Sequence, residues 1–193
     1  MRIVGERAVL RDRRASDLAD LARWMQPGLK WQRWDAPWEP VTPGQAPDPR
    51  DLDALLERER SQEPRRRLAI DTVDGRHIGL VSWYWVDEGS QWADLGITIY
   101  EDAEWSHGIG SEAFCMWADY VLASTGWPRV GFGTWSGNHR MIRIGERLGF
   151  LREASFRNAR RVDGVRYNAV RYGLLREEWE RAAWRGSSER REA

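Results

Sequence analysis

The residues most able to do chemistry form a glycine turn, EWSHGIGSEA at positions 104–113, just before a predicted helix. The first amide groups of a helix have no partner inside it, and the helix dipole favours an anion at that end. Gly108 and Gly110 also let a ligand approach the backbone, because glycine carries no Cβ atom. The turn therefore predicts a phosphate site, although a helix that begins there without a ligand explains the two glycines equally well.

Two common nucleotide motifs do not fit this turn. The spacing of Gly108, Gly110 and Ala113 matches the dinucleotide fingerprint, which requires an acidic residue about 20 positions further on, at the end of the next strand. The next predicted strand, RVGFGTW at 129–135, has no acidic residue, and the chain has no Gly-Lys-Ser/Thr of a P-loop at the turn. NAD and P-loop nucleotides are therefore excluded as the ligand.

The composition is ordinary for a soluble globular protein and limits the other classes of function. The 193 residues include 30 basic and 30 acidic side chains, so we expect no general binding to nucleic acid or to membranes. Cys115 is the only cysteine and the three histidines are far apart in sequence, so no metal site is predicted. The sequence contains no apolar run of about 18 residues and does not begin like a signal peptide, which predicts a cytoplasmic protein.

The elements that must position the turn follow from hydrophobic periodicity and turn signals. Strands are predicted at 7–12, 66–73, 77–86, 91–100 and 129–135, with a final hairpin at 154–162 and 166–175. Helices are predicted at 15–25, 49–62, 108–124 and 138–150. This order predicts one α/β domain with a mixed sheet over residues 1–180, followed by a charged tail at 181–193 that frays. The charged ending REEWERAAWRGSSERREA at 176–193 is predicted to form a partial helix.

A long segment at 26–49 is rich in proline, glycine and tryptophan. Trp31, Trp34 and Trp38 are costly to leave in water, so this segment is predicted to be an anchored loop and not a flexible linker. Long loops with anchors of their own are usually lids or binding loops.

Two segments together carry a resemblance to a known family. LGITIYEDAEWSHGIGSEAF at 95–114, followed by TWSGNHRMIRIGERLGF at 134–150, resembles the GNAT acyltransferases, and most of all their RimJ/RimL branch of protein N-terminal and spermidine acetyltransferases. The resemblance extends over roughly residues 6–180 and includes the ending DGVRYNAVRYGLLREEW. It implies a single-domain fold with a twisted, mostly antiparallel mixed sheet of about six to seven strands and about four helices.

The resemblance implies a site for acetyl-CoA. Its pyrophosphate would be bound by the backbone amides of His107, Gly108, Ile109, Gly110 and Ser111. Its pantetheine would pair with the strand edge that includes Ile97, Thr98 and Ile99, and the amide of Ile97 or Thr98 would polarise the thioester carbonyl. Asn138 would contact the pantetheine or order the loop beside it, and Arg143 would meet a CoA phosphate.

The catalytic residues are less well marked. Asp94 matches a family position that often holds Glu and is a candidate general base acting through water, or simply a solvated carboxylate at a strand end. Gly145 stands where many members carry a tyrosine that protonates the leaving thiolate. Ser136, Tyr100 or water would have to take that role. Trp105 replaces a Gln or Arg that supplies a donor near the phosphates in many members.

The acceptor amine would enter between the long loop and the final hairpin. Trp34, Asp35 and Trp38 would bind a cationic amine through cation–π and charge contacts, with Tyr167 as a further pocket residue. The tryptophans would otherwise serve only to anchor the loop.

The leading hypothesis is therefore an N-acetyltransferase in which a neutral primary amine attacks acetyl-CoA directly in a ternary complex. The acceptor would be a protein N-terminus, a polyamine or another small amine. A homodimer is one option, because the sequence leaves the oligomeric state open. An acyl-CoA-binding or sensing domain without catalysis is the alternative, suggested by Gly145 and Trp105. A structural protein that assembles through its tryptophans is the third hypothesis, and it predicts no CoA binding.

Overall fold

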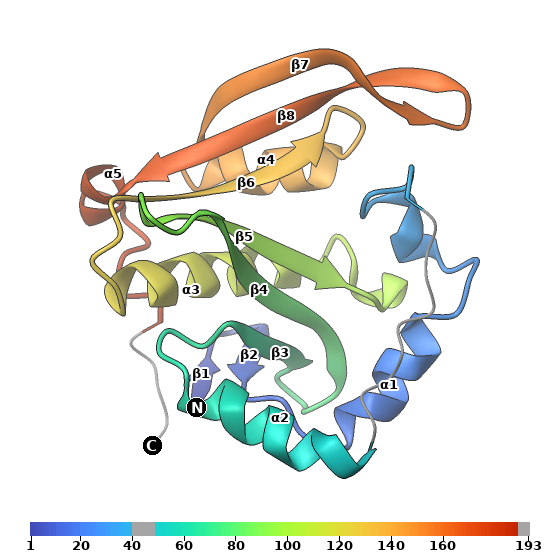
Figure 1. The fold of residues 1–193 in the computed structure, drawn as a ribbon, viewed down its shortest axis with the longest axis vertical. Coiled ribbons are helices and arrows are strands. Elements are labelled where there is room, and N and C mark those ends of the chain that lie inside the picture. The colour runs from blue at the N-terminus through green and yellow to red at the C-terminus, as the bar shows by residue number, and fades with distance from the viewer. Residues whose placement is uncertain (40–48, 189–193) are drawn as a thin grey trace.

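The computed structural model describes residues 1–39 and 49–188, and within these residues the chain forms one eight-stranded sheet (Figure 1). The sheet order is β1-β2-β3-β4-β5-β6-β8-β7. The strands are β1 (Arg2–Val4), β2 (Ala8–Arg11), β3 (Arg67–Thr72), β4 (His77–Asp87), β5 (Trp92–Ile99), β6 (Arg129–Trp135), β7 (Leu151–Val162) and β8 (Val165–Leu175). The sheet has eight strands and not the expected six to seven, because β1 has only three residues and is too short to show a periodicity in the sequence.

Five α-helices flank this sheet in the described residues, where about four were expected. The additional helix is α5, which has only five residues. They are α1 (Asp17–Trp24), α2 (Pro49–Ser61), α3 (Ile109–Ala123), α4 (His139–Arg147) and α5 (Arg176–Glu180). Two 3₁₀ turns, η1 (Lys30–Arg33) and η2 (Asp102–Glu104), lie in the connections. None of the described helices is long and apolar enough to cross a membrane.

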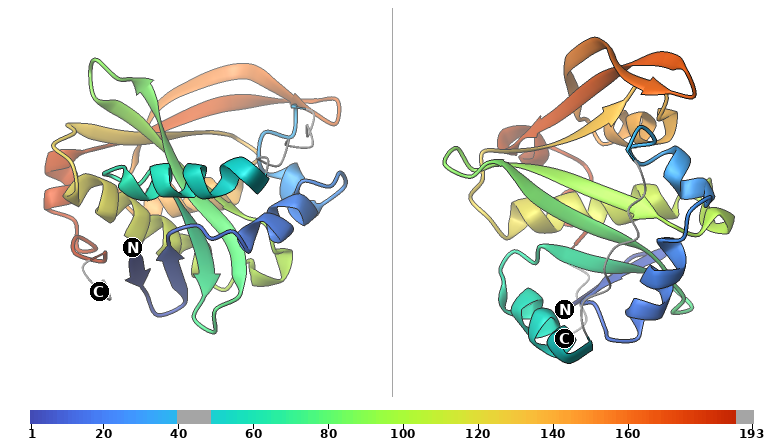
Figure 2. Two further views of the ribbon diagram at one scale, coloured as in Figure 1. Left: turned by 60° about the horizontal axis from the view of Figure 1, so that its bottom comes forward. Right: turned by 45° about the vertical axis from the view of Figure 1, so that its right-hand side comes forward.

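The helices cover both faces of the sheet (Figure 2). On one face, Trp24 of α1 stacks on Tyr100 just after β5, with ring centroids 4.5 Å apart. On the other face, Phe114 of α3 packs edge-to-face on Phe132 of β6. Most positions of α3 are buried, which agrees with its predominantly apolar sequence and places this helix in the core.

A feature of the sheet makes the site possible. All neighbouring strands run antiparallel except β5 and β6, which pair in parallel only through Trp92–Asp94 and Arg129–Gly131. Beyond Asp94 the two strands separate, and β6 continues to pair with β8 alone. The second half of β5 therefore presents an unpaired edge toward a V-shaped gap.

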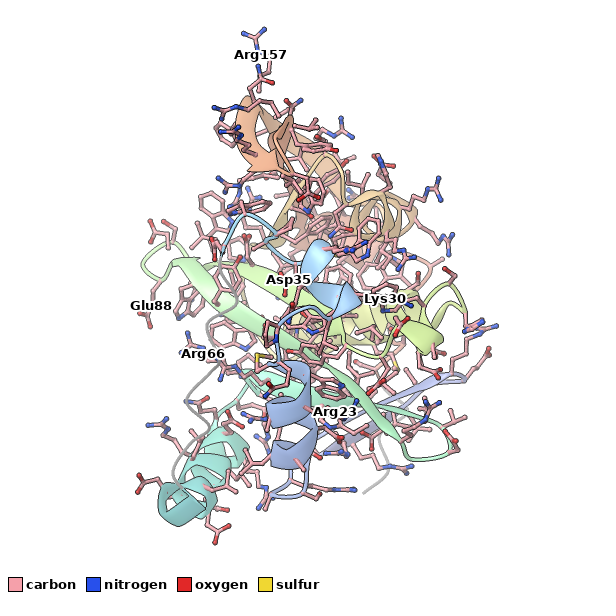
Figure 3. All side chains as sticks on the ribbon, turned by 90° about the vertical axis from the view of Figure 1, so that its right-hand side faces the viewer. Arg23, Lys30, Asp35, Arg66, Glu88 and Arg157 are labelled. Atoms are coloured by element: carbon pink, nitrogen blue, oxygen red, sulfur yellow. The ribbon has the colours of Figure 1, made fainter. Side chains whose placement is uncertain are left out.

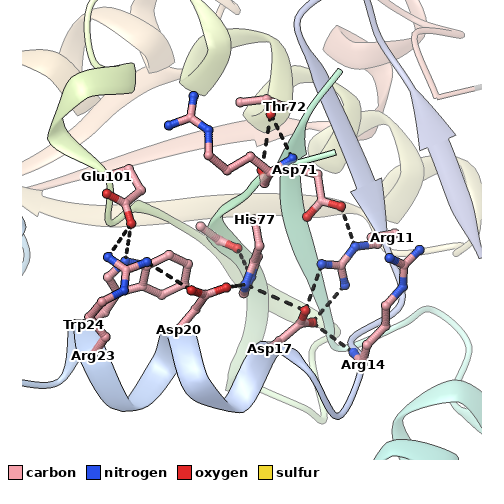
Figure 4. Close-up of polar contacts among 12 residues, drawn as sticks. Arg11, Arg14, Asp17, Asp20, Arg23, Trp24, Asp71, Thr72, His77 and Glu101 are labelled. Atoms are coloured by element: carbon pink, nitrogen blue, oxygen red, sulfur yellow. Dashed lines mark hydrogen bonds and ion pairs between the residues drawn. The ribbon is translucent and has the colours of Figure 1, made fainter. Parts of the chain in front are cut away.

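A buried charged cluster fixes α1 to the sheet (Figure 4). The Arg11 guanidinium of β2 lies between Asp17 of α1, at 2.8 Å, and Asp71 of β3, at 2.6 Å. Burial alone would raise the pKa of Asp17, but hydrogen bonds from Arg11 and the Arg14 amide hold it below the ordinary aspartate value. The cluster thus fixes the first turn of α1 against β2 and β3.

The chain after α5 differs from the predicted frayed tail. The carboxylate of Asp119, which is completely buried on α3, accepts hydrogen bonds from the Gly186 amide and from the amide and hydroxyl of Ser188. Trp184 donates from its indole nitrogen to the Leu148 carbonyl at 3.0 Å. Residues 184–188 are therefore anchored, and residues 189–193 lie outside the described part of the chain.

Candidate active site

The gap between β5 and β6 forms a cleft of about 890 Å³. Its walls come from the loop around η1, from β5, from the turn before α3, and from α4 and β8. Figure 3 looks onto this side of the molecule, where Asp35 and Lys30 mark the loop that borders the cleft. Its volume is that of a site for a sizeable organic ligand.

The glycine turn forms one end of the cleft. Gly108 has a φ of +83°, a conformation that glycine adopts without strain, and it precedes the first residue of α3. The Glu112 amide makes the first α-helical hydrogen bond, to the Gly108 carbonyl at 3.1 Å. The amides of Ile109, Gly110 and Ser111 therefore have no acceptor inside the helix, and these residues line the cleft. His107 is exposed and does not line the cleft, so it does not belong with the other four residues of the expected pyrophosphate site.

The acidic residue in the first turn of α3 is turned away from an incoming anion. Glu112 accepts hydrogen bonds from the backbone amides of Glu6, Arg7 and Ala8 at 2.7–2.9 Å. Its charge is used to hold the connection between β1 and β2 against the helix. The end of α3 thus keeps its preference for an anion.

Helix α4 supplies positive charge opposite this helix end. Arg140, Arg143 and Arg147 recur at helical spacing and all line the cleft. The Arg140 guanidinium lies 4.4 Å from the Trp105 ring centre and 4.9 Å from that of Trp34. Arg147 was missed from the sequence, although its spacing from Arg143 was the signal that could have found it.

The unpaired edge of β5 has a defined set of backbone groups. The Tyr100 amide donates to Ile78 of β4, and groups alternate along an antiparallel strand, so the Thr98 amide also points to β4. The amides of Leu95 and Ile97 point the other way, into the gap. The expectation that either Ile97 or Thr98 could donate to a thioester is therefore corrected, because only Ile97 has the required direction.

Trp105 closes the far end of this edge. Its indole nitrogen donates to the Ile99 carbonyl at 2.9 Å. Trp105, which stands where many members carry Gln or Arg, thus hydrogen-bonds a carbonyl of β5, and its ring packs against the Arg140 guanidinium.

Asn138 orders the loop that borders the cleft. Its side-chain oxygen accepts from the Met141 amide and caps α4, while its side-chain nitrogen donates to the Trp34 carbonyl at 3.1 Å. The Trp135 indole donates to the same carbonyl at 3.1 Å. Of the two roles expected for Asn138, these contacts fit the ordering of the loop.

The loop brings Trp34, Asp35 and Trp38 to the cleft wall. Asp35 accepts a 3.1 Å hydrogen bond from the Thr98 hydroxyl and is open to the cleft, yet surrounding protein limits its hydration. This desolvation raises the pKa of Asp35 above the ordinary aspartate value, with the Thr98 hydrogen bond opposing the shift and Glu39 adding to it. Asp35 is therefore a carboxylate on the cleft wall whose pKa is raised.

Tyr167 packs behind Trp135, one of the residues that line the cleft. Its ring packs edge-on against Trp135 at 4.8 Å, and it is not among the residues that line the cleft. Its strand partner Arg160 does line the cleft and lies 4.5 Å from the Trp38 ring centre.

Asp94 is not the solvated strand-end carboxylate that the sequence allowed. It is completely buried, and its two oxygens lie 2.9 and 2.8 Å from the Arg171 guanidinium, with the Tyr84 hydroxyl at 3.4 Å. Burial raises the pKa of Asp94, and the Arg171 charge opposes that shift. Its oxygens face Arg171 and not the cleft, so the geometry does not favour Asp94 as a general base.

Ser136 is also directed away from a ligand in the cleft. Its hydroxyl accepts a 3.0 Å hydrogen bond from the Asn168 amide and its amide donates to the Asn168 carbonyl. The residue lines a smaller cavity of about 360 Å³ beside His139. The suggestion that Ser136 protonates the leaving group is therefore corrected, because its hydroxyl joins β6 to β8.

The Gly145 position has no room for a larger residue. A Cβ atom at Gly145 would lie 2.3 Å from the Phe132 ring, which itself stacks on Tyr172 at 5.0 Å. The space beside Gly145 is thus filled by Phe132.

Comparison with known proteins agrees with this arrangement. Residues 7–151 match the family model described as an acetyltransferase (GNAT) domain. The chain is 31% identical over 107 residues to a putative ribosomal N-acetyltransferase of Bacillus subtilis. That match covers 55% of this chain and 58% of the relative.

Solved structures share the fold over nearly the whole chain. A probable acetyltransferase superposes with a TM-score of 0.71 at 22% identity, covering 93% of this chain and 99% of the other. A spermidine N-acetyltransferase from Vibrio cholerae, in complex with CoA and spermine, gives a TM-score of 0.67 at 16% identity and covers 90% and 98%. At these identities the likeness establishes the fold.

Proposed function

Since this chain belongs to the GNAT acetyltransferase family, we propose that it transfers the acetyl group of acetyl-CoA to a primary amine. The observation that carries the proposal is the cleft, which joins the free amides at the start of α3 to an unpaired strand edge and to the Asp35 carboxylate. The acceptor is a protein N-terminus, a polyamine or another small amine, as the names of the relatives suggest.

We assign the CoA phosphates to the free amides of Ile109, Gly110 and Ser111 and to the arginines of α4. The pantetheine would run along β5 and pair with the backbone of Ile97 and Leu95, which face the gap. One of these two amides would then donate to the thioester oxygen, where negative charge develops in the transition state.

In the chemical step, a neutral amine must reach the thioester carbonyl from the side of the cleft that carries Asp35. Its nitrogen bonds to the carbonyl carbon, the carbon–sulfur bond breaks, and the sulfur leaves as a thiolate. The proton that the nitrogen loses would pass to Asp35, directly or through water. A thiolate is a good leaving group, so the reaction tolerates glycine at position 145. Cys115 contacts Ser187 at 3.6 Å and not the cleft, which agrees with direct transfer.

A test combines thiol release with ligand binding. Purified protein is mixed with acetyl-CoA and a panel of peptides, polyamines and small amines, and CoA thiol is measured with a colorimetric reagent. CoA binding is measured by calorimetry for the wild type and for Gly108→Val, a variant in which the positive φ of the turn becomes strained. We expect amine-dependent thiol release, and loss of CoA binding in the variant with the fold retained by circular dichroism.

The second candidate is an acyl-CoA-binding or sensing domain. It is favoured by one observation, namely that neither Gly145 nor Ser136 offers an acid to the leaving thiolate. Tight CoA binding with no turnover on any amine would support it. Absence of CoA binding by the wild type would exclude both functions.

A further inference from the structure

One positive charge on the cleft wall has no role in the proposed function. Two of the other charged residues there, Glu104 and Arg171, form ion pairs within the protein. The arginines of α4 are assigned to the CoA phosphates, and Asp35 is assigned to the amine. Arg160 of β7 also lines the cleft, yet no carboxylate of residues 1–39 and 49–188 lies within ion-pair distance of it. Its charge is therefore available to a ligand.

The Arg160 guanidinium is held in position without being neutralised. It lies 4.5 Å from the Trp38 ring centre, and this cation–π contact orients the group while leaving its charge in place. In the described part of the chain its one hydrogen bond runs from Nη1 to the Ala159 carbonyl at 3.3 Å. Its Nε atom is buried without an acceptor there. A ligand anion would supply the opposite charge that the protein leaves out.

A continuous row of tryptophan contacts joins Arg160 to Asp35. Asp35 follows Trp34, whose carbonyl accepts a 3.1 Å hydrogen bond from the Trp135 indole. The Trp135 ring packs edge-on against Trp38, with ring centres 6.3 Å apart, and Trp38 in turn contacts Arg160. No ion pair joins these two described side chains to each other. The acid and the base therefore stand apart on the wall of one cleft.

Phe156 provides an apolar surface on the same face of the hairpin as Arg160. In the register of β7 and β8, Phe156 is opposite Ala169 and Arg160 is opposite Tyr167. Alternate residues of a strand share a face, so the two side chains project from one side. Both line the cleft, and Phe156 is 55% exposed. The acceptor end of the cleft thus combines an acid, an apolar surface and a base that do not neutralise one another.

We propose that the acceptor is a small amine that carries a carboxylate at the far end of an apolar chain. Its amine would lie beside Asp35, and its carboxylate would bind Arg160. This inference rests on the proposed function and names the substrate class of the same site. A polyamine fits less well, because Arg160 would repel its second ammonium group. A simple alkylamine would leave the charge of Arg160 without a partner.

The experiment compares amines that differ only at the end remote from the amine. They are ε-aminocaproate, its amide, hexylamine and hexamethylenediamine, which share a six-carbon chain. Thiol release from acetyl-CoA gives kcat and KM for each amine, and calorimetry with CoA present measures binding without turnover. The test variants are Arg160→Gln and Arg160→Glu. The control is Arg157→Gln, which removes an arginine of the same hairpin that projects away from the cleft (Figure 3).

We expect the KM of ε-aminocaproate to be about fivefold lower than that of its amide, with a similar kcat, and the difference to shrink at high salt. Arg160→Gln should remove most of this preference, and Arg157→Gln should keep it. Arg160→Glu should reverse it, so that hexamethylenediamine becomes the better acceptor. A reversal of preference cannot result from a damaged fold, and the reaction of hexylamine should be the same in all four proteins.

Turnover with equal KM values for the four amines, or a carboxylate preference that survives Arg160→Gln, overturns the inference and leaves the proposed function standing. Failure of ε-aminocaproate to bind also overturns the inference. The tripeptide amide Glu-Ala-Ala supplies the same two charges from a polypeptide, and its faster reaction would overturn the assignment to a small acceptor. Preferential binding of ε-aminocaproate without turnover of any amine supports the Arg160 site and removes the proposed function.

Discussion

The Thr98 hydroxyl donates a 3.1 Å hydrogen bond to the Asp35 carboxylate, and this contact joins the tryptophan-rich loop to the strand whose edge lines the cleft. The two residues are 63 positions apart in sequence. The contact places the exposed Asp35 carboxylate on the face of β5 opposite α3 and α4, where an acceptor would approach. Asp94, on the same face, is instead neutralised by Arg171.

Asp35→Asn should lower kcat at neutral pH by about 100-fold, because the variant cannot accept the proton of the amine. The KM for acetyl-CoA should change little. In the wild type, activity should fall as the pH drops through the raised pKa of Asp35, since only the ionised form is a base. Thr98→Val removes a hydrogen bond that lowers this pKa, so the acidic limb should move to higher pH. A pH–rate profile with the same acidic limb in Thr98→Val would contradict the assignment.

Asp94→Asn should affect stability more than the chemistry. The substitution leaves the partly buried Arg171 guanidinium without its partner and should cost about 2 kcal/mol of unfolding free energy in urea titrations. The acidic limb of the pH–rate profile should remain. If that limb disappears in Asp94→Asn and persists in Asp35→Asn, the two roles are reversed.

Arg147→Gln should weaken CoA binding by about fivefold, because one charge opposite the α3 end is lost. The binding of acetyl-pantetheine, which lacks the nucleotide phosphates, should be unaffected. Calorimetric titration with both ligands measures the difference, and Arg14→Gln is the matched control. Equal losses for the two ligands would indicate a general disturbance of the cleft.

Gly145→Ala should destabilise the protein, although alanine is the better helix former. The added Cβ would meet the Phe132 ring at 2.3 Å, and Tyr172 holds that ring in place. We expect a loss of about 1–3 kcal/mol and a lower Tm in thermal unfolding. Gly126→Ala is the control, because no atom lies within 4 Å of the added Cβ. A stabilised Gly145→Ala variant would show that the Phe132 ring moves without cost.

Asp17→Asn should remove part of the pH dependence of stability. The folded-state pKa of Asp17 is lowered, so its contribution is complete above the unfolded-state value of about 3.9 and is lost as the pH falls through the folded-state value. Urea unfolding from pH 7 downward should show a loss of about 3 kcal/mol in the variant at neutral pH, which diminishes in acid. Asp53→Asn, exposed on α2, should follow the wild type. A constant difference at every pH would contradict the expectation.

Several features of the fold and of the candidate site could be predicted from local sequence patterns. The order of most strands and helices follows from periodicity, and the glycine turn before α3 follows from Gly108, whose positive φ a residue with a Cβ atom rarely adopts. The arginines of α4 follow from helical spacing. Strand β1 was missed because three residues are too few to reveal a period, whereas α5 lies within the ending that was predicted to be a partial helix.

The sequence by itself determined the family, most of the elements and the glycine turn before α3, because these depend on residues close together in the chain. Only the tertiary structure decided which carboxylate faces the cleft. From the sequence, Asp94 is the candidate base and Asp35 is only a residue that binds a cationic amine. In the structure Arg171 of β8 pairs with Asp94, whereas Thr98 hydrogen-bonds Asp35 beside the open edge of β5. Strand pairing likewise decided that Ile97 and not Thr98 can donate into the gap. Such outcomes depend on which strands, distant in sequence, become neighbours in the sheet, and local periodicity does not indicate which strands pair.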